Sequence, residues 1–596
     1  MTTGTEDSRS VNFGAPRSFG TVLKSKVKET LFPDDPFHLL KNEPFGRRFL
    51  KTLQYFIPIC EWLPKYNLSF FKYDLLAGIT IASLAIPQAI SYANLAKIPP
   101  VIGLYSSFVP PLVYAVFGSS KHLAVGTVAA CSLLIAETIG ELASPTTDQE
   151  LYISLVFTAT FFSGLFQTAL GMLRLGILVD FLAHSTITGF MGGTAVLICL
   201  QQMKGLLGLK HFTKSTGVVD VLKAIHENRH EFNWKSALIG VMFLIFLQFT
   251  RFVKKKKPKL FWVSAIGPMA VVVAGCLFAY FAHAEKHGIA IVGPLKKGIN
   301  EPSVNRLIFD PKFVYGPIKA GLITGLIALA EGIAIGRSFA IATNEQIDGP
   351  FSKTAVNVNA GCKTPMSNVV QAVCMMMVLL FLAPLFSYTP QVALSAIIIS
   401  AMLGLIKYKK AYYLFKTDKF DFVICMSAFF GVSFISMDMG LIISVGLALL
   451  RALLYMARPA TCKLGNIPNS KLYRDVEQYP GATAIPGFLV LQVGSPIYFA
   501  NANYMKERIL RWVRDENELA MASEYNVEFV LLDFGAVTAI DTTGVESLHE
   551  VQRNLECKGM KVGKDAVFLS NEDAIEALRF SVQGSKQVDE EGLKRS

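Results

Sequence analysis

Polar side chains that can donate and accept hydrogen bonds stand in the middle of the apolar stretch SLAIPQAISYANLAKIPPVIGLY. Gln88, Ser91 and Tyr92 follow Pro87 at spacings i, i+3 and i+4, so a helix carries all three on one face. An unsatisfied polar group in hydrocarbon is costly, so this face needs polar partners or a watery cavity. Pro87 predicts a bend or break in the helix. A polar seam that joins helices explains these residues equally well.

Two further stretches have the pattern of half-helices that begin near the middle of a membrane. In KHLAVGTVAACSLL, Gly126 and Thr127 precede an apolar run shorter than a full span, and in PFSKTAVNVNAG, Ser352, Lys353 and Thr354 open an otherwise apolar stretch. A helix N-terminus offers unpaired N–H groups and about half a positive charge. Two such termini that meet would form an anion site. Alternatively, each stretch simply marks the edge of a loop.

Glu331, in GLIALAEGIAIGRSF, is an ionisable side chain inside an apolar segment. Such a residue is costly in a membrane and is a functional candidate by default, here as a carrier of a proton. A structural ion pair with Arg337 is the alternative. Asp180 and His184 fit a capping pair near a span entrance, and Asp438 is expected in a turn.

The composition places these residues in a membrane protein. Hydrophobic residues make up 52% of the 596, charged residues only 17%, and the mean hydropathy is +0.42, outside the usual soluble range. The net charge of +12 does not indicate nucleic-acid binding, because basic residues gather between apolar runs as positive-inside topology requires. The nine cysteines are scattered singly, which predicts packing residues in a reducing setting.

A series of apolar segments approaches the roughly 20 residues that a helix needs to cross a bilayer. They are 75–95, 101–117, 122–143, 151–173, 176–201, 236–253, 261–283, 318–342, 369–386, 392–406, 421–436 and 439–457. We therefore expect an all-α polytopic membrane domain, as in a transporter, channel or receptor. The basic cluster around Lys254–Lys257, the lysines at 407–410 and Arg458 should face the cytosol.

From about residue 484 the pattern becomes that of a small soluble α/β module. GFLVLQVGSPIYFA predicts paired strands, NYMKERILRWVRDENELA an amphipathic helix, EFVLLDFGAVTAID a buried strand and TTGVESLHEVQRNLECKG a second helix. Nowhere does a nucleophile elbow, phosphate loop or metal-ligand cluster stand in its required context, so we expect neither an enzyme nor a cofactor.

Together these motifs resemble the SulP family of anion transporters, and most closely its plant sulfate transporters. The resemblance rests on LAGITIASLAIPQAISYANLA, PPVIGLYSSFVPPLVYAVFGSSKHLAVG, FMGGTAV, EGIAIGRSFA and FSKTAVN, and DFGAVTAIDTTGVESL resembles the STAS domain of such proteins. It covers about residues 36–583 and implies fourteen membrane segments in two inverted repeats, a core domain that moves against a gate domain, and a STAS domain after them.

With this resemblance the expected domains are a cytosolic N-terminal region, a transmembrane transport domain, a linker, a STAS-like domain and a C-terminal tail. Their ranges are 1–72, 73–458, 459–483, 484–583 and 584–596. The resemblance further implies proton-coupled sulfate symport at a multi-pass membrane protein, at the plasma membrane or else in an organelle. It also implies a homodimer or hetero-oligomer that forms through the STAS-like domain.

Carried over by motif, the family's functional residues fall on the polar positions already described. Substrate binding would involve Gln88, Tyr92, Gly126, Thr127, Ser352 and Lys353, and proton coupling Glu331. Pro87 would interrupt its helix so that Gln88 and Tyr92 can bind the oxyanion. The expected partners are therefore sulfate or a similar oxyanion, protons and the lipid bilayer.

The chain departs from the family pattern after EQIDG, where Gly349 runs directly into Pro350. The family continues there with another membrane segment, so about 20 residues are missing. A similar jump follows Val562, where a helix of the STAS pattern is absent. The first gap raises a second hypothesis, that the chain is a non-transporting or regulatory partner of full-length sulfate transporters.

Smaller departures occur within the motifs. Thr127 stands where proline is usual, and Lys353 where arginine is common, which keeps the charge but loses the bidentate fork. In the STAS-like loop, Asp541 and the two threonines after it resemble a site that bacterial relatives phosphorylate. A hydroxyl before a helix start is more often a cap than a signalling site, so we expect capping there.

Overall fold

The computed structural model describes residues 18–31, 44–145, 147–173, 184–209, 211, 217–257, 260–295, 297–299, 302–341, 353–520, 527–557 and 567–579. The chain forms two compact units, one of Leu23–Ala448 and one of Leu449–Ser596 together with Met1–Val22. Ten helices of the described residues are long and apolar enough to cross a membrane. Each unit is described separately below, and two helices that cross the division, Phe19–Leu31 and Met437–Ala457, are given with the first unit.

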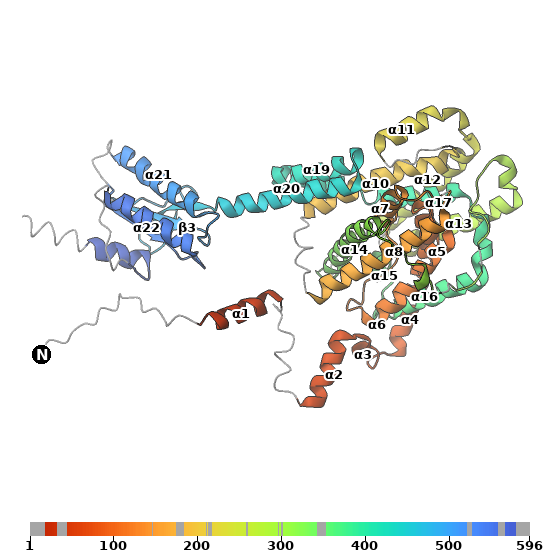
Figure 1. The fold of residues 1–596 in the computed structure, drawn as a ribbon, viewed down its shortest axis with the longest axis horizontal. Coiled ribbons are helices and arrows are strands. Elements are labelled where there is room, and N and C mark those ends of the chain that lie inside the picture. The colour runs from red at the N-terminus through yellow and green to blue at the C-terminus, as the bar shows by residue number, and fades with distance from the viewer. Residues whose placement is uncertain are drawn as a thin grey trace, which may run out of the picture. The chain divides into compact units, whose positions relative to one another are not determined.

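The named secondary-structure elements that the structure describes in the first unit are all helices (Figure 1). Its first part comprises α1 (Phe19–Leu31), α2 (Phe45–Phe56), α3 (Ile59–Trp62), α4 (Leu68–Leu95), α5 (Pro100–Ser106), α6 (Val109–Phe117), α7 (Ala129–Gly140), α8 (Gln149–Met172), α10 (His184–Leu207), α11 (Val218–Glu227) and α12 (Trp234–Lys256). There follow α13 (Phe261–Phe281), α14 (Tyr315–Ile341), α15 (Lys353–Asn359), α16 (Met366–Met377), α17 (Gln391–Leu403), α18 (Tyr408–Thr417), α19 (Lys419–Phe434) and α20 (Met437–Ala457).

Most of the apolar segments predicted from the sequence contain helices, but the segments are not all continuous spans. The segment 101–117 forms two helices, α5 and α6, residues 123–128 of the segment 122–143 are not helical, and 176–183 lies outside the described residues.

The sequence predicts a bend or a break at Pro87. The α4 helix continues through Pro87, so a break there is wrong, and a bend stays a prediction. Pro87 has no N–H to donate to Ser83 O, and a membrane helix that packs against neighbouring helices tolerates the loss of one such bond.

The α4 helix is the most buried of the candidate spans and joins two hydrophobic clusters. Near its C-terminal end, Tyr92 and Leu95 pack with residues of α7, α10, α14 and α19. Ala85, Ile86 and Ala89 pack instead with residues of α12, α13, α16 and α17. Because α4 lies between these clusters, its polar face is enclosed by protein rather than by lipid.

The second unit contains a four-stranded sheet in the order β2-β1-β3-β4, with α21 (Ala502–Ala520) and α22 (Thr542–Cys557) packed on it (Figure 1). The strands are β1 (Thr461–Asn466), β2 (Tyr473–Asp475), β3 (Phe488–Val493) and β4 (Phe529–Asp533). The β1 strand pairs antiparallel with β2 and β3, and β3 pairs parallel with β4. Apolar residues of β3, α21 and α22 form its core.

Two predictions from the sequence can be compared with the structure of this unit. The interval 459–483, expected as a linker, carries β1 and β2, and β1 is hydrogen-bonded to β3 in register Cys462–Gln492. The sheet therefore begins before the predicted boundary, since a strand of six residues with one buried face was too short to stand out from a loop. The start of α22 is capped, as predicted, but by a carboxylate and not by a hydroxyl, because Asp541 Oδ1 accepts from Gly544 N at 2.7 Å.

Candidate functional site

The candidate site begins with non-helical chain before α7. Residues 123–128 have no regular secondary structure, and α7 begins only at Ala129. Main-chain N–H groups of this segment donate to side chains of the second half of the unit. Ala124 N donates to Thr354 Oγ1 at 3.2 Å, and Val125 N donates to Asn368 Oδ1 at 3.2 Å.

The carbonyl groups of the same segment are also bound by amide side chains of α15 and α16. Asn357 Nδ2 donates to His122 O at 2.9 Å and Asn368 Nδ2 donates to Leu123 O at 2.9 Å. Gln371 Nε2 donates to Val125 O at 3.3 Å. The three amide residues are completely buried. Main-chain groups of a non-helical segment inside a membrane domain need such partners, so α15 and α16 hold the start of α7 in place.

Lys353, the first residue of α15, reaches the start of α7. Its side chain is only 7% exposed, and its Nζ has no hydrogen-bond partner among the described residues. A Cβ added to Gly126 would overlap Lys353 Nζ, so the ammonium group lies directly against the backbone of Gly126. A buried charge without a counterion is unfavourable, and an anion bound at this point would relieve that cost.

The polar face of α4 lies on another side of this region. Gln88, Ser91 and Tyr92 are all buried, at 4%, 1% and 6% exposed, as the helical spacing predicted. Tyr92 belongs to the cluster that contains Ala129 and Ala130, the first two residues of α7. The Tyr92 side chain therefore belongs to the same hydrophobic cluster as the first turn of α7.

Glu331 comes to this region from α14. Its Oε2 is buried and has no hydrogen-bond partner among the residues that the structure describes. The carboxylate is close enough to Tyr92 and Cys131 to act on both electrostatically. Cys131 lies in the first turn of α7, and its Sγ contacts Thr324 O of α14 at 3.8 Å. The predicted proton carrier thus borders the start of α7.

The structure brings Gly126, Thr127 and Lys353 together at one place and Tyr92 and Glu331 beside it. Thr127 Oγ1 is buried and has no hydrogen-bond partner in the described part of the chain. Ser352, Asp180 and the Arg337 side chain lie outside the described residues. Asp438 lies in the first turn of α20, where its Oδ2 pairs with Lys319 Nζ at 2.9 Å. The roles of the predicted site residues remain predictions.

Asp74 is a supporting residue that the sequence reasoning missed. This completely buried carboxylate of α4 accepts from Lys363 N at 2.7 Å, Thr364 N at 3.2 Å and Thr364 Oγ1 at 2.6 Å. It thereby ties the connection between α15 and α16 to the first span. Tyr66 Oη also donates to it at 3.4 Å, and burial followed by the Asp74 charge raises the pKa of Tyr66 to about 12. An acid within FFKYDLLAGIT was the available signal.

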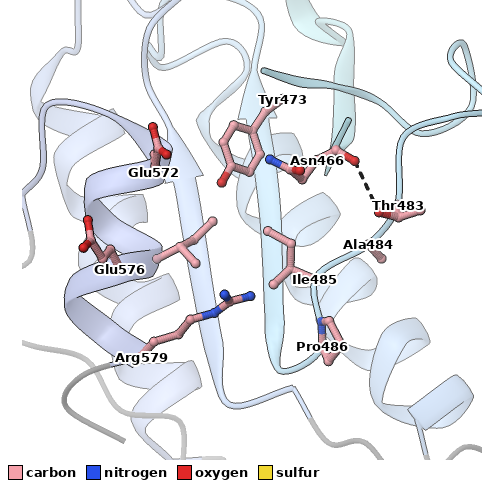
Figure 2. A pocket seen from close by; sticks show the side chains of 10 residues that line it. Asn466, Tyr473, Thr483, Ala484, Ile485, Pro486, Glu572, Glu576 and Arg579 are labelled. Carbon is pink, nitrogen blue, oxygen red and sulfur yellow. Dashed lines mark hydrogen bonds between the residues drawn. The ribbon is translucent and has the colours of Figure 1, made fainter. Parts of the chain in front are cut away.

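The α/β unit has a pocket of 590 Å³, which Figure 2 shows. Asn466, Tyr473 and Arg579 line it from β1, β2 and the helical segment 571–579, and it includes none of the predicted site residues. Across the described ranges, no three His, Cys, Asp or Glu side chains are grouped as a metal site requires.

A family model described as the sulfate permease family matches residues 71–350 and 346–428. The chain belongs to this family. A STAS domain model matches residues 479–563, which include β3, β4, α21 and α22. The polytopic membrane domain followed by a STAS domain is thus confirmed, and the chain is an integral multi-pass member of the sulfate permease family.

Relatives of this sulfate permease family member extend over nearly its whole length. "Probable sulfate transporter 3.5" of Arabidopsis thaliana is 60% identical and covers 98% of both chains. "Sulfate transporter 3.1" of the same plant is 49% identical over 96% of this chain and 94% of its own. "High affinity sulfate transporter 2" of Stylosanthes hamata is 42% identical over 94% and 92%.

The fold of this family member is similar to that of a solved structure of SLC26A9, with a TM-score of 0.78, 21% identity and coverage of 93% of this chain and 97% of that one. Murine Slc26a9 in the inward-facing state gives a TM-score of 0.76 at 20% identity, with coverage of 96% and 100%. These similarities concern the fold alone.

The comparisons also bear on the gap predicted after Gly349. The sulfate permease model matches in two pieces that meet at residues 346–350, which contain this position. The alignment with the 60% identical relative runs over 633 positions, more than the 596 residues of the chain, so gaps fall within this chain. The chain therefore belongs to the family although its match to the family model is interrupted just before α15.

Proposed function

We propose that this protein transports sulfate or a similar oxyanion across a membrane, in symport with protons. The observation that carries the proposal is the buried ammonium group of Lys353, which lies against Gly126 at the start of α7 without a hydrogen-bond partner among the described residues. The names of the plant relatives, which are sulfate transporters or probable ones, support the choice of substrate.

The chemistry around Lys353 favours a compact anion with several acceptor oxygens. The start of α7 adds N–H groups and a partial positive charge to that of the ammonium group. Gln88 and Tyr92 are buried on α4 and supply further donors, and Thr127 adds a hydroxyl. A tetrahedral oxyanion presents acceptors in several directions, so it can bind these donors simultaneously.

Proton coupling follows from the electrical cost of moving a dianion. Moving one charge against about 100 mV costs about 2.3 kcal/mol, so a dianion that enters a negative compartment costs about 4.6 kcal/mol. Two or more protons that enter with it would cancel or reverse this cost. Glu331 lies within electrostatic reach of Tyr92 and is the group we assign to proton uptake.

The test measures uptake of labelled sulfate into vesicles that contain the full chain, with and without an inward proton gradient. We expect uptake that the gradient stimulates, and we expect Glu331→Gln to abolish this stimulation. Glu150→Gln, which removes an exposed acid of α8, is the matched control. Full gradient-driven uptake by Glu331→Gln would remove Glu331 from the mechanism, and absence of sulfate uptake by the natural chain would contradict transport.

A second candidate function is favoured by the break in the family match at 346–350. In this alternative the chain is a regulatory partner that assembles with full-length sulfate transporters through its STAS domain. It predicts co-purification with such a relative and no flux when this chain is expressed alone. Flux by the isolated chain would exclude it. We propose the plasma membrane as the location and a homodimer or hetero-oligomer as the assembly, for which native mass spectrometry gives the stoichiometry.

A further inference from the structure

The short helix α2 has an apolar face that no described part of the chain covers. None of its twelve residues is buried, although Phe45, Phe49 and Phe56 are apolar and are 85%, 64% and 60% exposed. With Leu53 they recur at i, i+4, i+8 and i+11, which places them on one side of a helix. A soluble protein would bury such a face, so this face requires an apolar environment.

The opposite side of α2 is cationic. Arg47, Arg48 and Lys51 project away from the phenylalanine face, and the helix contains no acidic residue. Aromatic residues on one side with arginine and lysine on the other are typical of helices that lie in the plane of a membrane interface. There the rings enter the boundary of the acyl chains while the cations meet the headgroups.

The length and position of α2 agree with an in-plane location. Twelve residues extend about 18 Å, which is too short for the roughly 30 Å hydrocarbon core. The helix contacts α3, which in turn contacts α6 at the end of a candidate span, and α4 begins at Leu68. These connections keep α2 beside the ends of membrane-crossing helices.

We propose that α2 docks on the bilayer surface and binds anionic phospholipid headgroups through Arg47, Arg48 and Lys51. The negatively charged leaflet is complementary to these cations, and the phenylalanine face supplies the apolar contact that zwitterionic and anionic lipids share. The lipid partner is thus selected by headgroup charge. The proposal goes beyond transport and holds whether or not the chain carries sulfate.

The test uses hydrogen–deuterium exchange of the full chain in nanodiscs of phosphatidylcholine, with or without phosphatidylserine. Each cation contributes on the order of fivefold to surface binding, so we expect amide exchange in α2 to slow about tenfold or more when phosphatidylserine is added. The variant Arg47→Gln/Arg48→Gln/Lys51→Gln should lose this protection, because glutamine preserves helix propensity but not charge. Arg474→Gln/Arg511→Gln/Arg514→Gln, exposed in the α/β unit, should keep it.

Three results would overturn the proposal. Equal exchange in the two kinds of nanodisc would show that α2 does not sense headgroup charge. Equal protection by inorganic phosphate in detergent would assign the cations to a soluble anion. Protection in detergent that grows with protein concentration would assign the apolar face to a second copy of the chain. Loss of protection at higher ionic strength supports binding to the charged headgroups.

Discussion

The two halves of the candidate site are built differently. The first half, residues 121–128 before α7, contributes mainly backbone, and Gly126 has no side chain at all. The second half, α15 and the start of α16, contributes the side chains Lys353, Thr354, Asn357, Asn368 and Gln371. The second half therefore supplies both the positive charge of Lys353 and the hydrogen bonds that hold the first half in its non-helical form.

The largest expected effect tests the charge of the second half. Lys353→Gln should lower the initial rate of sulfate uptake about 30-fold or more, because loss of a buried charge from its ionic partner costs about 2–5 kcal/mol. Lys353→Arg should retain much more activity, because it keeps the positive charge. Equal rates for Lys353→Gln and the natural protein would show that the charge does not act on the substrate.

A smaller effect tests the backbone of the first half. In Gly126→Ala the new Cβ would overlap Lys353 Nζ, so the lysine must move away from the start of α7. We expect sulfate uptake to fall about tenfold, by analogy with misplaced groups in other sites. Gly140→Ala, at the other end of α7, is the control, since its added Cβ meets no atom within 4 Å. Similar rates in both variants would contradict the close approach.

The thermal stability of variants should show how far residues 121–128 depend on hydrogen bonds from α15 and α16. Asn368→Ala leaves Val125 N and Leu123 O without partners, at about 1–3 kcal/mol for each buried group. Asn357→Ala removes one bond to this segment, from His122 O, and should be less destabilising. Thermal unfolding in detergent would rank the two variants. A larger decrease in the thermal midpoint for Asn357→Ala than for Asn368→Ala would contradict this order.

The smallest expected effect is the pH dependence of stability that comes from Tyr66, which donates a hydrogen bond to Asp74. The pKa of Tyr66 is about 12 in the folded protein and 10.0 for the free group, so the folded state retains the proton longer. The stabilisation that protonated Tyr66 contributes to the folded state is therefore fully present below pH 10, and it is lost as the pH rises towards 12. Tyr66→Phe should be less stable below pH 10 by at most about 1 kcal/mol, and the difference should narrow at higher pH. A constant difference in thermal midpoint would contradict this sign.

The local patterns were predictable from the sequence, whereas the bonds between distant segments were not. The late start of α7 after Gly126 and Thr127 and the buried face of α4 follow from residue types and helical spacing. Asn368, by contrast, binds carbonyl and amide groups more than 240 residues earlier. A polar residue in an apolar segment indicates that a partner exists, but the spacing along the chain cannot identify that partner.

Asp74 has a consequence for chains that differ in length ahead of α15. Its bonds to Lys363 and Thr364 connect the first span to sequence downstream of Lys353, 289 and 290 residues away. These bonds thus join residues on either side of the break in the family match, and they include no residue of the segment 346–350 that contains it. Asp74 therefore attaches the connection between α15 and α16 to α4 without using any atom of the stretch whose length departs from the family pattern.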